Sequence, residues 1–137
     1  DNHSHSVKNV LRGLHYQIKR PQGHLIYVMR GDIFDVGVDL RPESPTFGQW
    51  LGFRLSGDQP QQVFMPAGIA HGFCVLSDRA DILYKCTDYF VPDDEGGLLW
   101  NDPDLKIEWP IHEPLVNERD SGFPALKQIS KDQLPVL

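Results

Sequence analysis

Six stretches of the sequence are rich in apolar and β-branched residues with a period of two, and short turn-forming segments separate them. Such alternation is typical of β-strands that bury one face. The stretches are residues 25–31, 32–40, 47–56, 61–66, 71–77 and 81–90. Because they follow one another closely, with no helical period between them, we expect an all-β sandwich or barrel.

The segments between and after these stretches add three expectations. Gly31 and Asp32 predict a hairpin turn between two strands, and Gly57 with Asp58 ends another strand. The turn-rich, aromatic segment 91–110 should pack over a face of the barrel or contact a partner. From Asn117 onward we expect a loop, with a short helical turn within residues 130–137.

Length and charge limit the classes of function. The 137 residues fit one domain, residues 1–137, with a core of its own. The net charge of −6 argues against nucleic acid as a partner, although a phosphorylated small molecule needs only a few local cations. No apolar run approaches the roughly 20 residues that span a bilayer.

The start of the sequence is polar and lacks both an initiator Met and a visible secretory signal. We therefore expect a cytoplasmic protein whose upstream residues, including the first strand of its fold, are missing from this sequence. Cys74 and Cys86 each lie in an apolar strand-like run, and we expect two buried, reduced thiols. A disulfide or a catalytic thiol is the alternative.

Two motifs place histidines beside strands. PAGIAHGF, residues 66–73, sets His71 after a glycine turn, where it would face the mouth of a small barrel. Its Pro-x-Gly-x-x-His spacing resembles the second motif of the cupin superfamily. LRGLHYQ, residues 11–17, carries Arg12 and His15. A carboxylate such as Asp120 could fix the tautomer of His15 for general-base work, although spacing alone does not bring the two together.

Several longer motifs occur in a fixed order: LRGLHYQ, PQG, GDIFDVGVDLR with SPTFG, PAGIAHGF, YK-x-TDYF, DEGG and WNDP with WP. Together they resemble the dTDP-4-dehydrorhamnose 3,5-epimerase family over roughly residues 1–120. The resemblance implies a homodimeric cupin-type double-stranded β-helix barrel that uses neither metal nor cofactor. It also implies a dTDP-4-keto-6-deoxy sugar as the substrate.

The resemblance further implies roles for individual residues. His15 would take the proton next to the ketone, Asp120 would orient and stabilise the imidazolium, and Tyr84 would return a proton from the opposite face. A phenol, with an ordinary pKa near ~10, suits an enolate. The positions that match substrate contacts are Asn2, Arg12, Gln17, His71, Glu95 and Arg119. Arg12 and Arg119 suit a diphosphate.

One position departs from the family pattern. Where the family has lysine after Pro-Gln-Gly, this chain has His24, which can donate a hydrogen bond and, if protonated, supply positive charge. The exchange leaves four readings open: a slower epimerase, a 3-epimerase only, a keto-sugar isomerase, or a lost activity with the binding pocket kept. It also opens a metal-binding alternative in which His15, His24 and His71 converge as ligands.

Overall fold

The computed structural model describes residues 1–137 and consists mainly of β-strands. The strands are β1 (Asn2–Val7), β2 (Val10–Gln17), β3 (His24–Arg30), β4 (Asp32–Asp39), β5 (Trp50–Ser56), β6 (Val63–Met65), β7 (Ile69–Val75), β8 (Arg79–Cys86), β9 (Glu95–Gly97) and β10 (Leu115–Val116). The helices are α1 (Glu118–Ser121) and three 3-10 turns, η1 (Pro92–Asp94), η2 (Leu126–Gln128) and η3 (Lys131–Gln133).

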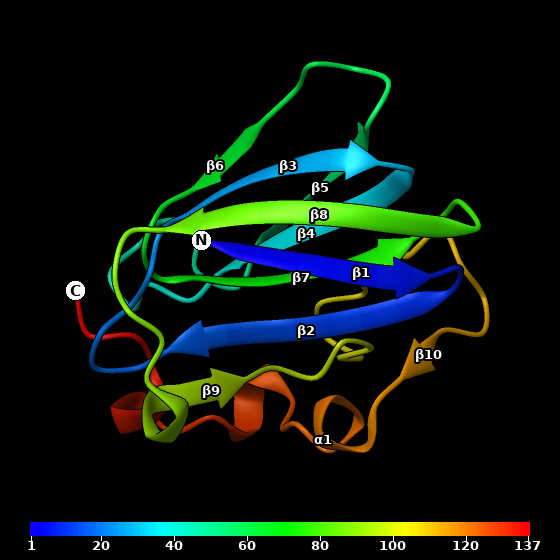
Figure 1. Ribbon diagram of the computed structural model, residues 1–137. Coiled ribbons are helices and arrows are strands. Elements are labelled where there is room, and N and C mark those ends of the chain that lie inside the picture. The colour runs from blue at the N-terminus through cyan, green and yellow to red at the C-terminus, as the bar shows by residue number, and fades with distance from the viewer.

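The strands form two sheets that face one another (Figure 1). One sheet has the order β1-β8-β3-β6, and the other has the order β10-β2-β7-β4-β5 with β9 paired to β2. From β1 to β4 and from β5 to β8, each strand lies in the sheet opposite the one before it. This alternation is the winding of a double-stranded β-helix, so the prediction of an all-β barrel is confirmed.

The predicted hairpin at Gly31 and Asp32 is wrong. The strands on either side of it, β3 and β4, pair with β6 and β8 and with β5 and β7, respectively, and not with each other. Gly31 has a φ of +81°, and an added Cβ would lie 2.1 Å from the carbonyl oxygen of Arg79. The glycine therefore lets the chain cross from one sheet to the other at a point of close backbone approach.

The six predicted stretches correspond to β3 to β8, but the predictions missed β1, β2, β9 and β10. On β2 the buried Leu11, Leu14 and Tyr16 do not keep a strict period of two, because the pairing with β7 is irregular between Arg12 and His15. β1 has serines at its two buried positions, Ser4 and Ser6, so no hydrophobic alternation marks it. Residues 47–49 form a turn before β5, and residues 87–90 form a loop after β8, so both of those predicted strands are shorter than expected.

The central strands β4 and β7 of the six-stranded sheet are buried on both faces, whereas its edge strand β5 is largely exposed. On β4, Ile33 belongs to a cluster between the sheets, whereas Val36 and Val38 belong to a second cluster on the outer face. Leu105 and Trp109 pack against that outer cluster. The expectation that segment 91–110 covers a barrel face is therefore confirmed.

On β3 and β8, the inward-facing side chains change from apolar to polar along the strand. On β3, Ile26 and Val28 belong to the apolar cluster between the sheets, and His24, two residues earlier, borders a cavity. On β8, Ile82 is in the same cluster and Tyr84 borders the same cavity. One half of the barrel is thus an apolar core and the other half is a polar hollow.

The loop predicted from Asn117 onward contains a short helix. Asn117 is the N-cap of α1, and the orange segment that carries α1 runs beside β2 and β9 (Figure 1). The predicted helical turn near the C-terminus is present as η3. None of the helices has the length and hydropathy that crossing a membrane requires.

Candidate active site

A cavity of about 610 Å³ opens between the two sheets, within the range of small-molecule sites. We call it the central cavity. Nine of the predicted site residues line it: Asn2, Arg12, His15, His24, His71, Tyr84, Glu95, Arg119 and Asp120.

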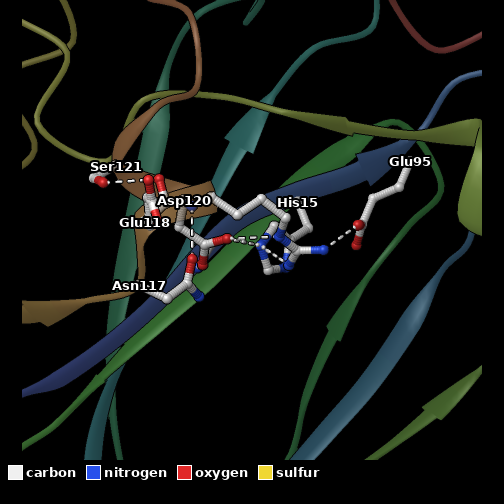
Figure 2. Close-up of polar contacts among 8 residues, drawn as sticks. His15, Glu95, Asn117, Glu118, Asp120 and Ser121 are labelled. Atoms are coloured by element: carbon white, nitrogen blue, oxygen red, sulfur yellow. Dashed lines mark hydrogen bonds and ion pairs between the residues drawn. The ribbon is translucent and has the colours of Figure 1, made fainter.

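His15 and Asp120 meet at the wall of this cavity. The Nε2 atom of His15 lies 2.9 Å from Oδ1 of Asp120, although the residues are 105 positions apart in the sequence (Figure 2). The side chain of His15, on β2, is 28% exposed, and that of Asp120 is fully buried. The pair therefore presents one ring to the cavity and keeps its carboxylate away from water.

Hydrogen bonds keep the buried carboxylate ionised. Burial alone would raise the pKa of Asp120, but the bonds from His15 and the N–H of Gly13, with the charges of His15 and Arg119, lower it to about 2. Gly13 can donate because the β2–β7 register shifts between Arg12 and His15. This position requires glycine for two reasons. The φ of Gly13 is +113°, and a Cβ added here would lie only 2.6 Å from Cα of Gly72.

Arg119 adds positive charge beside the pair. Its Nη1 donates to Glu95 at 2.6 Å, and its Nε donates to Asp120 at 3.2 Å. Its Nη2 also lies 3.1 Å from Nε2 of His15. Because an ionised Asp120 can only accept, we assign the ring proton to Nε2 of His15, which leaves Nδ1 as the free base. The contact between Arg119 and the ring is then an approach without a hydrogen bond.

Tyr84 approaches the cavity from the opposite sheet. It lies on β8, whereas His15 lies on β2, and both side chains line the same hollow. Burial, more than the nearby Cys86 and Glu95, raises the pKa of the phenol, although Arg12 works against this. Tyr84 therefore keeps its proton at neutral pH and has one to donate.

His24 is uncharged at neutral pH, although the family has a positively charged lysine at this position. Burial first, and then the charges of His71 and His15, lower its pKa to about 3. Its ring packs 5.5 Å from that of His71 and 6.0 Å from that of Tyr84, centroid to centroid. At neutral pH His24 is a neutral hydrogen-bonding group, which corrects the expectation that it could supply positive charge.

The metal-binding alternative is not supported by the arrangement of the three histidines. The Nε2 atoms of His15 and His71 are each taken by a carboxylate, Asp120 at 2.9 Å and Asp35 at 2.7 Å. His15, His24 and His71 do not form a group that could hold a metal ion.

Gln17 is the one predicted substrate residue that does not line the cavity. Its buried side chain donates to the carbonyl oxygens of Arg20 and Tyr89 and accepts from the N–H of Val91. Gln17 thus holds the loop after β8 in place by hydrogen bonds. The sequence motif alone does not distinguish this structural role from substrate binding.

The cavity also contains residues that sequence reasoning missed. Asn117 borders it and caps α1, and an asparagine three residues before Asp120 was the available signal. Cys86 borders it as well and is only partly buried, unlike Cys74, and both thiols are free. Cys86 was expected in the core because its flanking run is apolar.

The fold and the site together define a cupin-type barrel with an acid–base pair in its cavity. The chain belongs to the dTDP-4-dehydrorhamnose 3,5-epimerase family, whose model matches residues 1–128.

Named relatives agree with this assignment. The chain is 56% identical over 121 residues to a dTDP-4-dehydrorhamnose 3,5-epimerase of Pseudomonas aeruginosa, covering 88% of this chain and 67% of the relative. It is 50% identical to one of Neisseria gonorrhoeae, covering 98% of this chain but only 41% of the relative.

A solved structure is similarly close. The dTDP-6-deoxy-D-glucose-3,5-epimerase of Legionella pneumophila, in complex with dTDP-4-keto-L-rhamnose, aligns with a TM-score of 0.94 and 49% identity. The alignment covers 98% of this chain and 72% of that one. The chain thus spans between two fifths and about three quarters of these three proteins.

Proposed function

We propose that this chain is an isomerase that epimerises a dTDP-4-keto-6-deoxyhexose at carbon 5, carbon 3 or both, in dTDP-rhamnose-type biosynthesis. The observation that carries the proposal is the hydrogen-bonded His15–Asp120 pair, which shares one cavity with Tyr84 on the opposing sheet. The names of the relatives and the nucleotide-sugar complex of the Legionella protein support the same reaction.

The reaction begins with removal of a proton next to the ketone. Nδ1 of His15 accepts the proton, the C–H electrons move into the C–C–O system, and the ketone oxygen becomes an enolate. The negative charge of Asp120 stabilises the imidazolium that forms. Its pKa of about 2 means that Asp120 does not take up the proton itself at neutral pH.

The reaction ends with protonation of the opposite face. The phenol of Tyr84 donates its proton to the carbon as the enolate returns to the ketone, and both Tyr84 and His15 then exchange with water. The net change inverts one carbon and replaces its hydrogen with one from solvent. No redox partner is needed.

Enolate stabilisation is where this chain departs from the family pattern. A neutral His24 can donate a hydrogen bond to the ketone oxygen but brings no charge, unlike the family's lysine. A well-placed donor to an oxyanion contributes ~3–4 kcal/mol in hydrolases, so the exchange should slow the reaction. The neutral His24 therefore supports a slower epimerase, or one that inverts a single carbon, among the alternatives.

Substrate binding uses the rest of the cavity wall. Arg12 and Arg119 would contact the diphosphate, and Asn2, His71 and Glu95 would contact the nucleotide or the sugar. We also infer a homodimer and a cytoplasmic location, both from the family resemblance. Sedimentation of the purified protein would test the dimer.

Turnover in deuterated water tests the proposed function. The protein is incubated with dTDP-4-keto-6-deoxyglucose and the sugar is analysed by mass spectrometry. Two deuteriums mean that both carbons exchange, and one means that a single carbon does. No incorporation, with binding still detected by calorimetry, would indicate a cupin that binds the nucleotide sugar without acting on it.

A further inference from the structure

We propose that Asn117 is a positioning residue for the acid–base pair, because its side chain fixes the backbone of Asp120 where the carboxylate meets His15. The inference rests on the proposed function.

The helix that carries Asp120 cannot hold its own geometry. α1 has four residues, far fewer than a helix needs to be stable in isolation. The first N–H groups of any helix also lack partners within it. Asn117, in an extended conformation, supplies one: its Oδ1 accepts from the backbone N–H of Asp120 at 2.7 Å (Figure 2). The capped residue is therefore the one whose side chain bonds to His15.

Asn117 is in turn anchored to the strand that carries His15. The two residues before it form β10, which pairs in parallel with Val10 and Leu11 of β2. The N–H of Leu115 also donates to the carbonyl oxygen of Asn9 at 2.7 Å. The cap thus connects the backbone of Asp120 to β2 by a short and well-bonded path.

Asp120 is then held from two sides. The Asn117 side chain holds its backbone, and the N–H of Gly13 holds its Oδ2 at 2.9 Å, while Oδ1 remains for His15. Without the cap, the turn keeps the backbone bonds from Ser121 to Asn117 and from Gly122 to Arg119 but loses the one bond that fixes the N–H of Asp120. A displacement of about 1 Å in a catalytic group can cost on the order of a hundredfold in rate.

If Asn117 only stabilised the fold, its replacement would affect the melting temperature and not kcat. The side chain of Asn117 is exposed, so truncating it to alanine leaves no void in the apolar core. A structural role would lower the melting temperature by a few degrees and leave turnover per folded molecule unchanged. A positioning role lowers kcat at temperatures where the protein is fully folded.

The test compares three variants by deuterium incorporation at 25 °C. Asn117→Ala removes the acceptor and should lower kcat about tenfold or more, with KM changing less than twofold. Asn117→Ser keeps a capping oxygen and should retain at least about a third of the activity. Asn101→Ala, at an exposed asparagine with no side-chain hydrogen bond, is the matched control and should match the parent protein.

The outcomes separate this inference from the proposed function. Normal kcat in Asn117→Ala, or equal loss in Asn117→Ala and Asn117→Ser, would overturn the positioning role. If the parent protein shows no exchange, the proposed function fails, and the crystal structure of Asn117→Ala still decides the positioning. A separation of His15 Nε2 from Asp120 Oδ1 beyond 3.5 Å supports it, and an unchanged 2.9 Å overturns it.

Discussion

Two His–Asp pairs of the barrel have a fully buried carboxylate, and they differ in their surroundings. In the His15–Asp120 pair the histidine is 28% exposed, whereas in the His71–Asp35 pair it is 10% exposed, and both carboxylates are fully buried. The carboxylate of Asp120 accepts hydrogen bonds from three groups: the ring of His15, the N–H of Gly13 and Nε of Arg119. Asp35 has His71 alone, and its Oδ2 is buried without a partner.

The two pairs also have different origins in the fold. Asp35 and His71 lie on adjacent strands, β4 and β7, of one sheet. Asp120 reaches His15 from a helix turn outside the sheets. The two pairs therefore differ in exposure and support: the ring of His15 is partly exposed and its carboxylate has two further donors, whereas the ring of His71 is nearly buried and its carboxylate has none.

Replacing His15 should have the largest effect on activity. His15→Asn keeps a donor for Asp120 but removes the base, so kcat should fall at least about a thousandfold with little change in folding. Deuterium incorporation measures this loss, and His112→Asn, at an exposed histidine, is the control. Residual turnover within tenfold of the parent would mean that His15 is not the base.

Replacing His71 should have the larger effect on stability. His71→Ala leaves Asp35 buried with no partner, and the free energy of unfolding should fall by about 3 kcal/mol. His15→Ala should cost about 1 kcal/mol or less, because Asp120 keeps Gly13 and Arg119. Urea unfolding of both variants measures the difference. Equal losses would show that the two pairs are energetically alike.

The pH dependence of stability should reveal the neutral His24 between the two pairs. Its pKa is lowered to about 3 in the folded protein from an ordinary 6.5, so the unfolded chain binds more protons between these values. Stability is therefore full above about pH 6.5 and falls as the pH drops towards 3, by about 1 kcal/mol between pH 6 and pH 5.

A matched variant isolates this contribution. His24→Gln, which cannot titrate, should remove that part of the slope in urea titrations run from pH 7 to pH 4. Asp120 affects the pH dependence of stability in a separate, lower pH range. Because its pKa is lowered to about 2, its contribution is lost only below about pH 4. An unchanged slope in His24→Gln would mean that His24 is protonated in the folded protein.

Strict apolar alternation in the sequence predicted six strands, and recognisable motifs predicted most of the residues that line the cavity. The sequence did not predict β2, where the irregularity between Arg12 and His15 breaks the period of two. It could not indicate β1, because the inward residues Ser4 and Ser6 are polar. It also could not separate a hairpin from a crossover at Gly31, because both need a glycine with positive φ. Which sheet each strand joins depends on long-range pairing that local patterns do not contain.

Most of the residues that line the cavity were predictable from the sequence, but their electrostatics were not. The neutrality of His24 follows from burial beside His71 and His15, and the second pair follows from Asp35 facing inward on β4. Both facts depend on which side chains meet across strands. The same limit explains Gln17, whose motif places it correctly on β2 while its amide turns to a loop.

The 105-residue separation of His15 and Asp120 has a consequence for synthesis. Chains leave the ribosome from the N-terminus, and domains begin to fold as they emerge. All four strands of one sheet, and β2, β7, β4, β5 and β9 of the other, are complete by Gly97. A nascent chain can therefore close its barrel while it still lacks the carboxylate, and the His15–Asp120 pair forms only when the last segment docks.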